Sequence, residues 1–236
     1  MNKRKAIVTG ASRGIGLAIC QTLHHEGFDL VGIARSLPSG IDTGLFDHVI
    51  EQDLSNPDSI VAFATRLARE QEDADTIISC AGAGRFAPLE SLGVDDIRYQ
   101  LNLNLLAPML IARAFVPIFK KRRQGNFVFI GSEAGHQAGQ RGTAYSASKF
   151  GLRGFVKSLR IECASRGIRV CLINPGMTQT DFYAGQGFAP GKGDAEHLRA
   201  KDIADAVTLV LNAPSGTVFD EINLSPLNRV IDFKSN

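Results

Sequence analysis

The sequence predicts a single α/β domain of the doubly wound type, with a parallel seven-stranded sheet and helices on both faces. Short runs of β-branched residues alternate with longer helical patterns along the whole chain. Some of these runs are apolar at every position, as at 127–130, which suits parallel strands that are covered on both faces. A glycine-rich turn also joins the first strand to the first helix, a connection typical of such sheets.

The expected elements alternate in order along the chain. Strands are expected at 5–9, 29–34, 49–52, 76–79, 126–130, 169–173 and 218–222. Helices are expected at 15–26, 57–71, 95–122, 143–165 and 200–212. Right-handed crossovers between parallel strands place these helices on both faces of the sheet. No Pro- or Ser-rich linker interrupts the series, so we expect one domain over 1–236, with a glycine-rich lid near 182–199.

Composition excludes several classes of protein. A chain of 236 residues, 44% of them hydrophobic, can bury a core without metals or disulfides. A net charge of +2 gives no basic field for nucleic acid. Short apolar runs and a first strand that begins close to the amino terminus predict neither a membrane span nor a signal peptide. The four cysteines lack the spacing of metal ligands, so we expect reduced thiols and a cytoplasmic location.

The glycine-rich turn has the sequence T-G-A-S-R-G-I-G over 9–16. Glycines there allow a tight turn and a close approach to a pyrophosphate, whose charge is met by free N–H groups at the positive end of the helix dipole. This is the ligand geometry of Rossmann-type folds, and the alternative is a turn that serves packing alone. The expected cofactor contacts here are Gly10, Ser12, Arg13, Gly14, Ile15 and Gly16.

The charge after the second strand predicts which dinucleotide binds. A fold that binds NAD normally has an acidic residue there, about 20 residues beyond the glycines, to hold the ribose 2′-hydroxyl. This chain has Arg35, and Arg13 is expected on the same side. Two guanidinium groups favour a 2′-phosphate and hence NADP(H), unless both are solvated surface arginines. After the third strand, Asp53-Leu54 is a candidate for contact with the adenine, or alternatively an acid near a helix start.

A tyrosine and a lysine form the expected centre of the chemistry. Tyr145 and Lys149 are separated by four positions on a predicted helix and therefore share a face. The pKa of a free tyrosine is about 10, and bringing it near neutrality requires about 4 kcal/mol. An ammonium about 4 Å away supplies about 4 kcal/mol at an effective dielectric constant of about 20. Alone, this short pattern favours an ordinary solvated helical pair.

Further polar residues are expected near this pair. Ser132 follows the fifth strand, and reactive groups gather outside the carboxyl ends of strands in such sheets. A turn or cap serine is the alternative. Asn102 and Asn104 lie in an apolar helical stretch, where a buried amide either satisfies a structural group or belongs to a proton path. A hydroxyl of the 174–180 loop could bind the nicotinamide carboxamide.

Together these segments resemble the short-chain dehydrogenase/reductase family, in its compact subtype, over nearly the whole chain. The matching motifs are T-G-A-S-R-G-I-G, A-G, N-L, G-S, Y-S-A-S-K and N-P-G-x-x-x-T, in that order. The resemblance implies that Tyr145 is the general acid/base and that Lys149 lowers its pKa and binds the nicotinamide ribose. It implies further that Ser132 orients the carbonyl, that Asn104 holds a water in a proton relay, and that Thr180 contacts the cofactor.

One departure from the family pattern lies after the fourth strand. Ser79-Cys80 stands where the family commonly has two asparagines, which puts the side-chain hydrogen bonds of this strand in doubt. Ala81 and Gly82 are still expected beside the cofactor ribose. The sixth-strand loop is expected to contribute the cofactor contacts Pro175, Gly176, Thr178 and Thr180.

The resemblance is nearest, in length and motifs, to the 3-oxoacyl-thioester reductases. It implies an NADP(H)-dependent enzyme that reduces a carbonyl or oxidises a secondary alcohol, and a dimer or tetramer packed through 95–122 and 143–165. The basic run 120–123 with Arg166 would suit an acidic carrier protein, although a helix C-terminus attracts cations by itself.

Two alternatives remain open: a sugar or polyol dehydrogenase on the same scaffold, and a non-catalytic NADP(H)-binding regulator. Three aromatic residues either line an apolar substrate pocket or pack within the lid, namely Phe182, Tyr183 and Phe188.

Overall fold

The computed structural model describes residues 3–37, 40 and 42–233, which form the predicted doubly wound sheet. All neighbouring strands of the central sheet are parallel, in the order β10-β6-β5-β4-β1-β2-β3. The order reverses after β3, where the chain crosses back to β4 beside β1, so ligands are expected outside the carboxyl ends near β1 and β4. The strands are β1 (Lys5–Thr9), β2 (Asp29–Ala34), β3 (His48–Glu51), β4 (Thr76–Ser79), β5 (Gly125–Ile130), β6 (Ile168–Pro175) and β10 (Glu221–Leu224).

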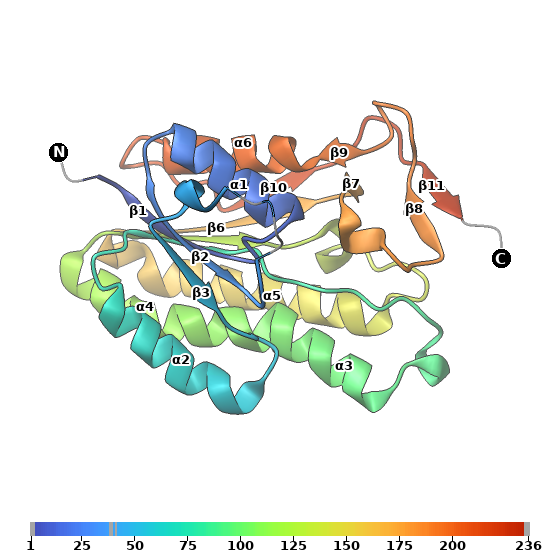
Figure 1. Ribbon diagram of the computed structural model, residues 1–236, viewed down its shortest axis with the longest axis horizontal. Coiled ribbons are helices and arrows are strands. Elements are labelled where there is room, and N and C mark those ends of the chain that lie inside the picture. Colours follow the sequence, from blue (N-terminus) through green and yellow to red (C-terminus); the bar gives the residue numbers. More distant parts are fainter. Residues whose placement is uncertain (1–2, 38–39, 41, 234–236) are drawn as a thin grey trace.

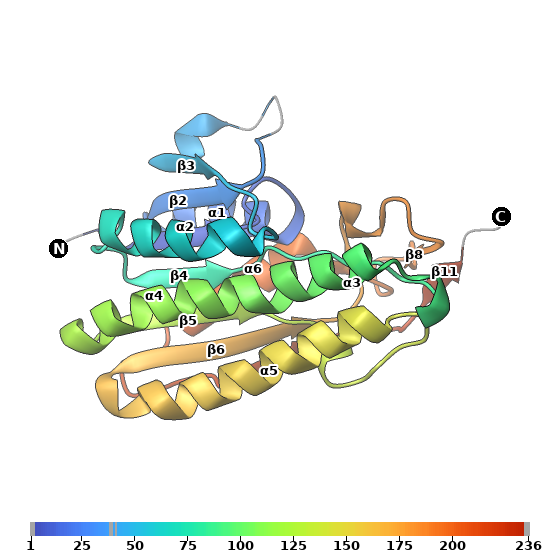
Figure 2. The same ribbon diagram turned by 90° about the horizontal axis from the view of Figure 1, so that it is seen from below.

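Helices cover both faces of the sheet (Figure 1). On one face α1 (Gly14–His25) and α6 (Ala200–Leu211) bury their apolar sides, including Ile19 and Val207, against the sheet. On the other face lie α2 (Pro57–Glu70), α3 (Val94–Leu101), α4 (Ala107–Arg122) and α5 (Thr143–Cys163), and Figure 2 shows α2, α4 and α5 as one layer. Two apolar cores, one under each layer, therefore hold the strands in place.

Two predicted elements differ from the structure. The single helix expected at 95–122 is interrupted by a π-helical turn at Asn102–Leu106, with Ala107 N–H bonded to the Asn102 carbonyl. Pro108 has no N–H to donate to the carbonyl four residues earlier, so one α-helical hydrogen bond is missing directly beside this turn. The last strand of the central sheet lies at Glu221–Leu224 rather than 218–222, and Phe219 packs against the core from the irregular segment before it.

The helical run Val94–Arg122 is long and apolar enough, with a mean hydropathy of 1.5, to pass a length-and-composition test for a membrane span. In the fold one side of this run packs against the sheet, where Ile111, Phe115 and Phe119 are buried. Packing against the sheet accounts for part of its apolar character, since 33% of the apolar window is buried.

The predicted lid region contains two short sheets. In the first, β7 (Thr178–Gln179) pairs with β9 (Leu198–Arg199). In the second, β8 (Phe188–Pro190) pairs in antiparallel fashion with β11 (Ile231–Phe233), and both lie at one end of the molecule (Figures 1 and 2). The middle of the lid is therefore fixed to a strand from the end of the chain.

Short 3₁₀ turns lie at Thr43–Leu45, Leu89–Ser91, Glu133–Gly135, Ala164–Arg166 and Asp181–Tyr183.

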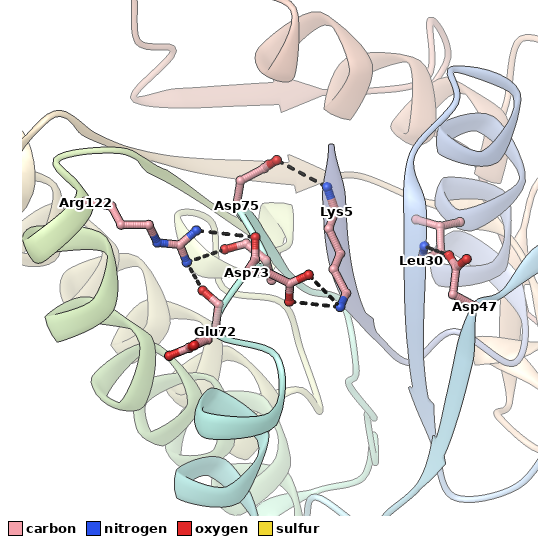
Figure 3. A network of polar contacts seen from close by, with 8 residues as sticks. Lys5, Leu30, Asp47, Glu72, Asp73, Asp75 and Arg122 are labelled. Atoms are coloured by element: carbon pink, nitrogen blue, oxygen red, sulfur yellow. Dashed lines mark hydrogen bonds and ion pairs between the residues drawn. The ribbon is translucent and has the colours of Figure 1, made fainter. Parts of the chain in front are cut away.

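A network of charged and polar contacts closes the amino-terminal edge of the sheet (Figure 3). Lys5 Nζ lies 2.9 Å from Asp73 Oδ1, and the Lys5 N–H donates to Asp75 Oδ2 over 3.2 Å. At the end of α4, the Arg122 guanidinium donates to the backbone carbonyls of Glu72, Asp73 and Ala74, the last over 2.9 Å. These contacts join the end of α4 to the turn before β4.

The basic run 120–123 lies at this same edge. Lys120 pairs with Glu162, Arg122 holds the turn before β4, and Arg123 donates to the Ser165 carbonyl. Three of its four cations are thus engaged with their own chain, as expected for cations at a helix C-terminus.

Candidate active site

The opposite edge of the sheet holds a cavity of about 350 Å³. Every predicted site residue except Asn104 lines it. From the glycine turn and the loops after β2 and β3 come Gly10, Ser12, Arg13, Gly14, Ile15, Gly16, Arg35, Asp53 and Leu54. From the loops after β4, β5 and β6 and from α5 come Ala81, Gly82, Ser132, Tyr145, Lys149, Pro175, Gly176, Thr178 and Thr180.

The glycine turn keeps its backbone open to the cavity. Gly10 and Gly14 have φ values of +73° and +55°, the left-handed region that favours glycine. A Cβ on Gly16 would lie 2.1 Å from the Gly10 carbonyl oxygen, so no larger residue fits where α1 crosses the turn. Arg13 precedes α1 without a side-chain cap, which leaves the first N–H groups of α1 without a side-chain partner from this position. Such a helix start suits a phosphate group.

Arg13 and Arg35 both line the cavity and are exposed to solvent. Among the described residues, neither guanidinium forms a hydrogen bond or an ion pair. Asp53, the predicted contact for the adenine, already has a partner within the chain. Its Oδ1 accepts hydrogen bonds from the N–H and the hydroxyl of Ser55. The helix cap that follows is Asn56, not Asp53. The two arginines thus offer unpaired positive charge at the mouth of the site.

Tyr145 and Lys149 lie on one face of α5 and are buried, with 8% and 6% of their surface exposed. The Lys149 ammonium lies 5.9 Å from the centre of the Tyr145 ring and donates to the Ile130 carbonyl over 3.0 Å. The end of β5 therefore orients the lysine. The side chains that the sequence brings together are brought together in space.

Burial shifts the pKa values of both groups. Burial raises the pKa of Tyr145 to about 12, opposed by a hydrogen bond with Ser132. Burial also lowers the pKa of Lys149 to about 8. Removal from water is thus the largest influence on the pKa of each group in the chain without cofactor. That Lys149 lowers the pKa of the phenol stays a prediction.

Ser132 fills the cap role that is its alternative in the sequence, and its part in orienting a carbonyl stays a prediction. Its Oγ accepts the Ala134 N–H over 3.1 Å and so caps the short turn Glu133–Gly135. A hydroxyl that accepts one hydrogen bond can still donate its own proton. The Ser132 hydroxyl and the Tyr145 phenol both line the cavity.

Asn104 lies behind the cavity, within the π-helical turn and only 1% exposed. Its Oδ1 accepts the Ala83 N–H over 2.9 Å, and its Nδ2 donates to the Ala83 carbonyl and to Ser148 Oγ. The amide thus satisfies the backbone of the loop after β4 and links it to α5. Its part in a proton relay stays a prediction.

At the Ser79-Cys80 departure a side chain of β1 binds the backbone of the loop after β4. Thr9 Oγ1 accepts the N–H groups of Cys80 and Ala81, each over 3.0 Å. This threonine joins β1 to the loop after β4, which is the contact that the missing asparagines put in doubt. Burial raises the pKa of the Cys80 thiol to about 12, so it is a packing residue rather than a reactive thiolate.

Sequence reasoning expected the 84–94 loop to help select the substrate but did not single out Phe86 within it. Phe86 lies 5.2 Å from the Tyr145 ring, 6.2 Å from Phe182 and 5.0 Å from Phe188, measured between ring centres. We call Phe86, Tyr145, Phe182, Tyr183 and Phe188 the aromatic cluster. No periodicity marks a lone phenylalanine in a loop. Tyr99 and Leu103 line the cavity as well and were not predicted.

Comparison with known proteins agrees with this geometry. A sepiapterin reductase of Chlorobaculum tepidum is 28% identical, over 95% of this chain and 96% of its own length. A 3-oxoacyl-[acyl-carrier-protein] reductase of Buchnera aphidicola is 30% identical, over 77% of this chain and 76% of its own. A crystal structure of a metagenomic short-chain oxidoreductase in complex with NADP has a TM-score of 0.78 and 32% identity, over 94% and 96% of the two chains. The short chain dehydrogenase profile matches residues 4–187, and the chain belongs to that family.

Proposed function

We propose that this enzyme is an NADP(H)-dependent oxidoreductase that interconverts a ketone and a secondary alcohol. The observation on which this depends is the convergence of Tyr145, Lys149 and Ser132 on one cavity whose other end carries Arg13 and Arg35. A sensor that only binds the cofactor would not need a phenol, an ammonium and a hydroxyl beside it. The proposal therefore favours an enzyme over a regulator.

The residues present fit a dinucleotide with a 2′-phosphate. The glycine turn and the start of α1 would hold the pyrophosphate, and the arginines would hold the 2′-phosphate. Lys149 would hold the nicotinamide ribose, and the cofactor supplies or accepts the hydride when bound. The NADP complex of the metagenomic relative supports the choice of cofactor.

In the reductive direction Tyr145 is the proton donor. Its pKa of about 12 keeps the phenol protonated at neutral pH, and the oxygen of a reduced carbonyl is basic enough to take that proton. Ser132 holds the carbonyl oxygen by donating its hydroxyl proton. Lys149 stabilises the phenolate that remains, because its ammonium is the nearest cation and the surroundings are dry.

The substrate is a small carbonyl compound. A 3-oxoacyl thioester is one candidate, since one relative is such a reductase, while another is a sepiapterin reductase. The basic run 120–123 does not favour a carrier protein, because it lies at the amino-terminal edge and the cavity lies at the carboxyl-terminal edge. A sugar or polyol substrate is the second candidate.

We further propose a cytoplasmic homo-oligomer, a dimer or tetramer, which a sizing measurement would test.

Steady-state oxidation of NADPH in the presence of ketones, 3-oxoacyl thioesters and ketoses tests the proposal. We expect turnover with at least one class, and loss of that turnover in Tyr145→Phe with NADPH affinity largely kept, because only the proton donor is removed. Tight NADPH binding without turnover of any class would favour the regulator. Full activity of Tyr145→Phe would exclude this tyrosine as the proton donor.

A further inference from the structure

The surroundings of Tyr145 differ from the rest of the cavity in their chemistry. The rings of Phe86 and Phe182 lie 5.2 and 5.7 Å from the Tyr145 ring, and Tyr183 lies 5.1 Å from Phe182. Phe188 closes the aromatic cluster, 5.0 Å from Phe86 and 5.6 Å from Tyr183. Most of these pairs are tilted or edge-to-face, the arrangement that aromatic rings prefer.

Phe86 is the member that the main body of the fold holds in place. The loop around it is fixed by the bond from the Ala87 N–H to the Arg141 carbonyl, 2.9 Å long. A Cβ on Gly84 would lie 2.5 Å from the Phe86 ring and 2.9 Å from the Phe182 ring, so this glycine makes room for both.

Phe182, Tyr183 and Phe188 come instead from the lid. Gln186 Nε2 donates to the Gly84 carbonyl over 3.0 Å and holds this part of the lid against the Phe86 loop. Behind it, β8 pairs with β11. The lid rings are therefore positioned from two sides, by Phe86 and by a strand from the end of the chain.

Among the described lining residues of the cavity the cations are Arg13, Arg35 and Lys149. The arginines belong to the glycine-turn end, and Lys149, 5.9 Å from the Tyr145 ring, is the residue assigned above to the nicotinamide ribose and the phenolate. A carboxylate or phosphate next to the reacting carbonyl would therefore compete with the cofactor and the phenolate for this one cation, which costs affinity. A flat, uncharged, conjugated group would instead meet ring faces and edges.

We propose that the aromatic cluster selects substrates whose carbonyl carbon bears a flat, conjugated and uncharged group, with Phe86 as the residue that sets this preference. The inference rests on the proposed function and deepens it. Phe182 and Tyr183 line the cavity and contact the substrate group, and Phe86 acts by fixing their positions against Tyr145.

The test compares two ketones of equal carbon number, acetophenone and cyclohexyl methyl ketone, with NADPH as the reductant. For each enzyme, kcat/KM for acetophenone is divided by kcat/KM for cyclohexyl methyl ketone. The measured quantity is this ratio in the wild type divided by the same ratio in Phe86→Leu, so that the intrinsic reactivity of the two ketones cancels. We expect this quotient to be about 10, mostly through the KM for acetophenone. Phe182→Leu should give a quotient of similar size if Phe86→Leu folds poorly.

Phe233→Leu is the matched control. Phe233 is the register partner of Phe188 on β11, but it is 77% exposed and outside the aromatic cluster. Its quotient should be about 1. Quotients near 1 in both Phe86→Leu and Phe182→Leu, with ketones still reduced, would overturn the inference and leave the proposed function standing. Absence of NADPH oxidation with every carbonyl compound would overturn both.

Discussion

At the amino-terminal edge of the sheet, Lys5 pairs with Asp73 and Arg122 donates to three backbone carbonyls, so charges there are satisfied within the chain (Figure 3). At the carboxyl-terminal edge, Tyr145 and Lys149 are buried without an acidic partner among the described residues, and the arginines of the glycine turn end carry no ion pair there. The charged groups at one edge of the sheet are thus paired within the described chain, and those at the other edge are not.

This difference indicates that one edge of the sheet contributes stability and the other contributes ligand binding. Satisfied charges at the first edge stabilise the folded chain without need of a ligand. Buried groups without a counter-charge at the second edge cost stability, and that cost is recovered only when a ligand supplies the missing partners. Substitutions at the two edges should therefore have opposite consequences for activity and stability.

The largest effect is expected for Lys149→Met. Loss of the ammonium beside the phenol should lower kcat by about 10²- to 10⁴-fold. The free energy of unfolding should stay level or rise, because a buried group that carries charge is replaced by an apolar one. Turnover with NADPH and urea unfolding measure the two quantities.

Lys157→Met is the matched control on the same helix, since Lys157 is exposed and lies 3.7 Å from Glu221. It should leave kcat unchanged. If Lys149→Met is clearly less stable than the wild type, then Lys149 stabilises the fold as the charges at the amino-terminal edge do. That result would contradict the difference between the two edges.

The next effect concerns Arg35→Asp. Reversing this charge should change the preference between NADPH and NADH by roughly 10²-fold, because an acid there repels a 2′-phosphate and can hold a 2′-hydroxyl. The ratio of kcat/KM values for the two cofactors measures it. Arg166→Asp makes the same change of charge near the opposite edge and should leave the ratio unaltered. A wild type that uses both cofactors equally would contradict the role of the arginine.

At the amino-terminal edge, Arg122→Met should do the reverse of the lysine substitution. Losing its hydrogen bonds to the carbonyls before β4 should lower the free energy of unfolding by about 1–2 kcal/mol, with kcat/KM unchanged. Lys121→Met, on the neighbouring exposed position, should leave stability within about 0.5 kcal/mol of the wild type. Loss of activity in folded Arg122→Met would show that the two edges are coupled.

The carboxyl-terminal edge was also where sequence reasoning succeeded most and failed most. Local patterns placed the glycine turn, Ser132 and the Tyr145–Lys149 pair, because each follows a strand or repeats at a helical interval. Patterns could not give the pKa of Tyr145, which depends on how completely the folded chain buries the phenol. That burial is a property of the assembled fold.

Contacts between segments far apart in the sequence could not be predicted from local patterns either. The pairing of β8 with β11 joins residues about forty positions apart, and short strands of this kind have no repeat long enough to recognise. The π-helical turn at Asn102–Leu106 lies just before Pro108, but helical periodicity alone predicts a continuous helix over 95–122. Strands and helices with strong periodicity, by contrast, were predicted to within a few residues.

The smallest effect comes from the titration of Lys149. Its pKa is lowered to about 8 in the folded chain from 10.5. Between these values the unfolded chain binds the proton and the folded chain does not, so the stability of the protein without cofactor should rise with pH. Between pH 7 and 9 the gain should be about 1 kcal/mol relative to Lys149→Met, measured by urea unfolding at each pH. Arg122→Met keeps Lys149 and should show the same rise as the wild type. If the difference between wild type and Lys149→Met does not change over this range, the lysine has an ordinary pKa and the charge at the catalytic edge is better solvated than its burial indicates.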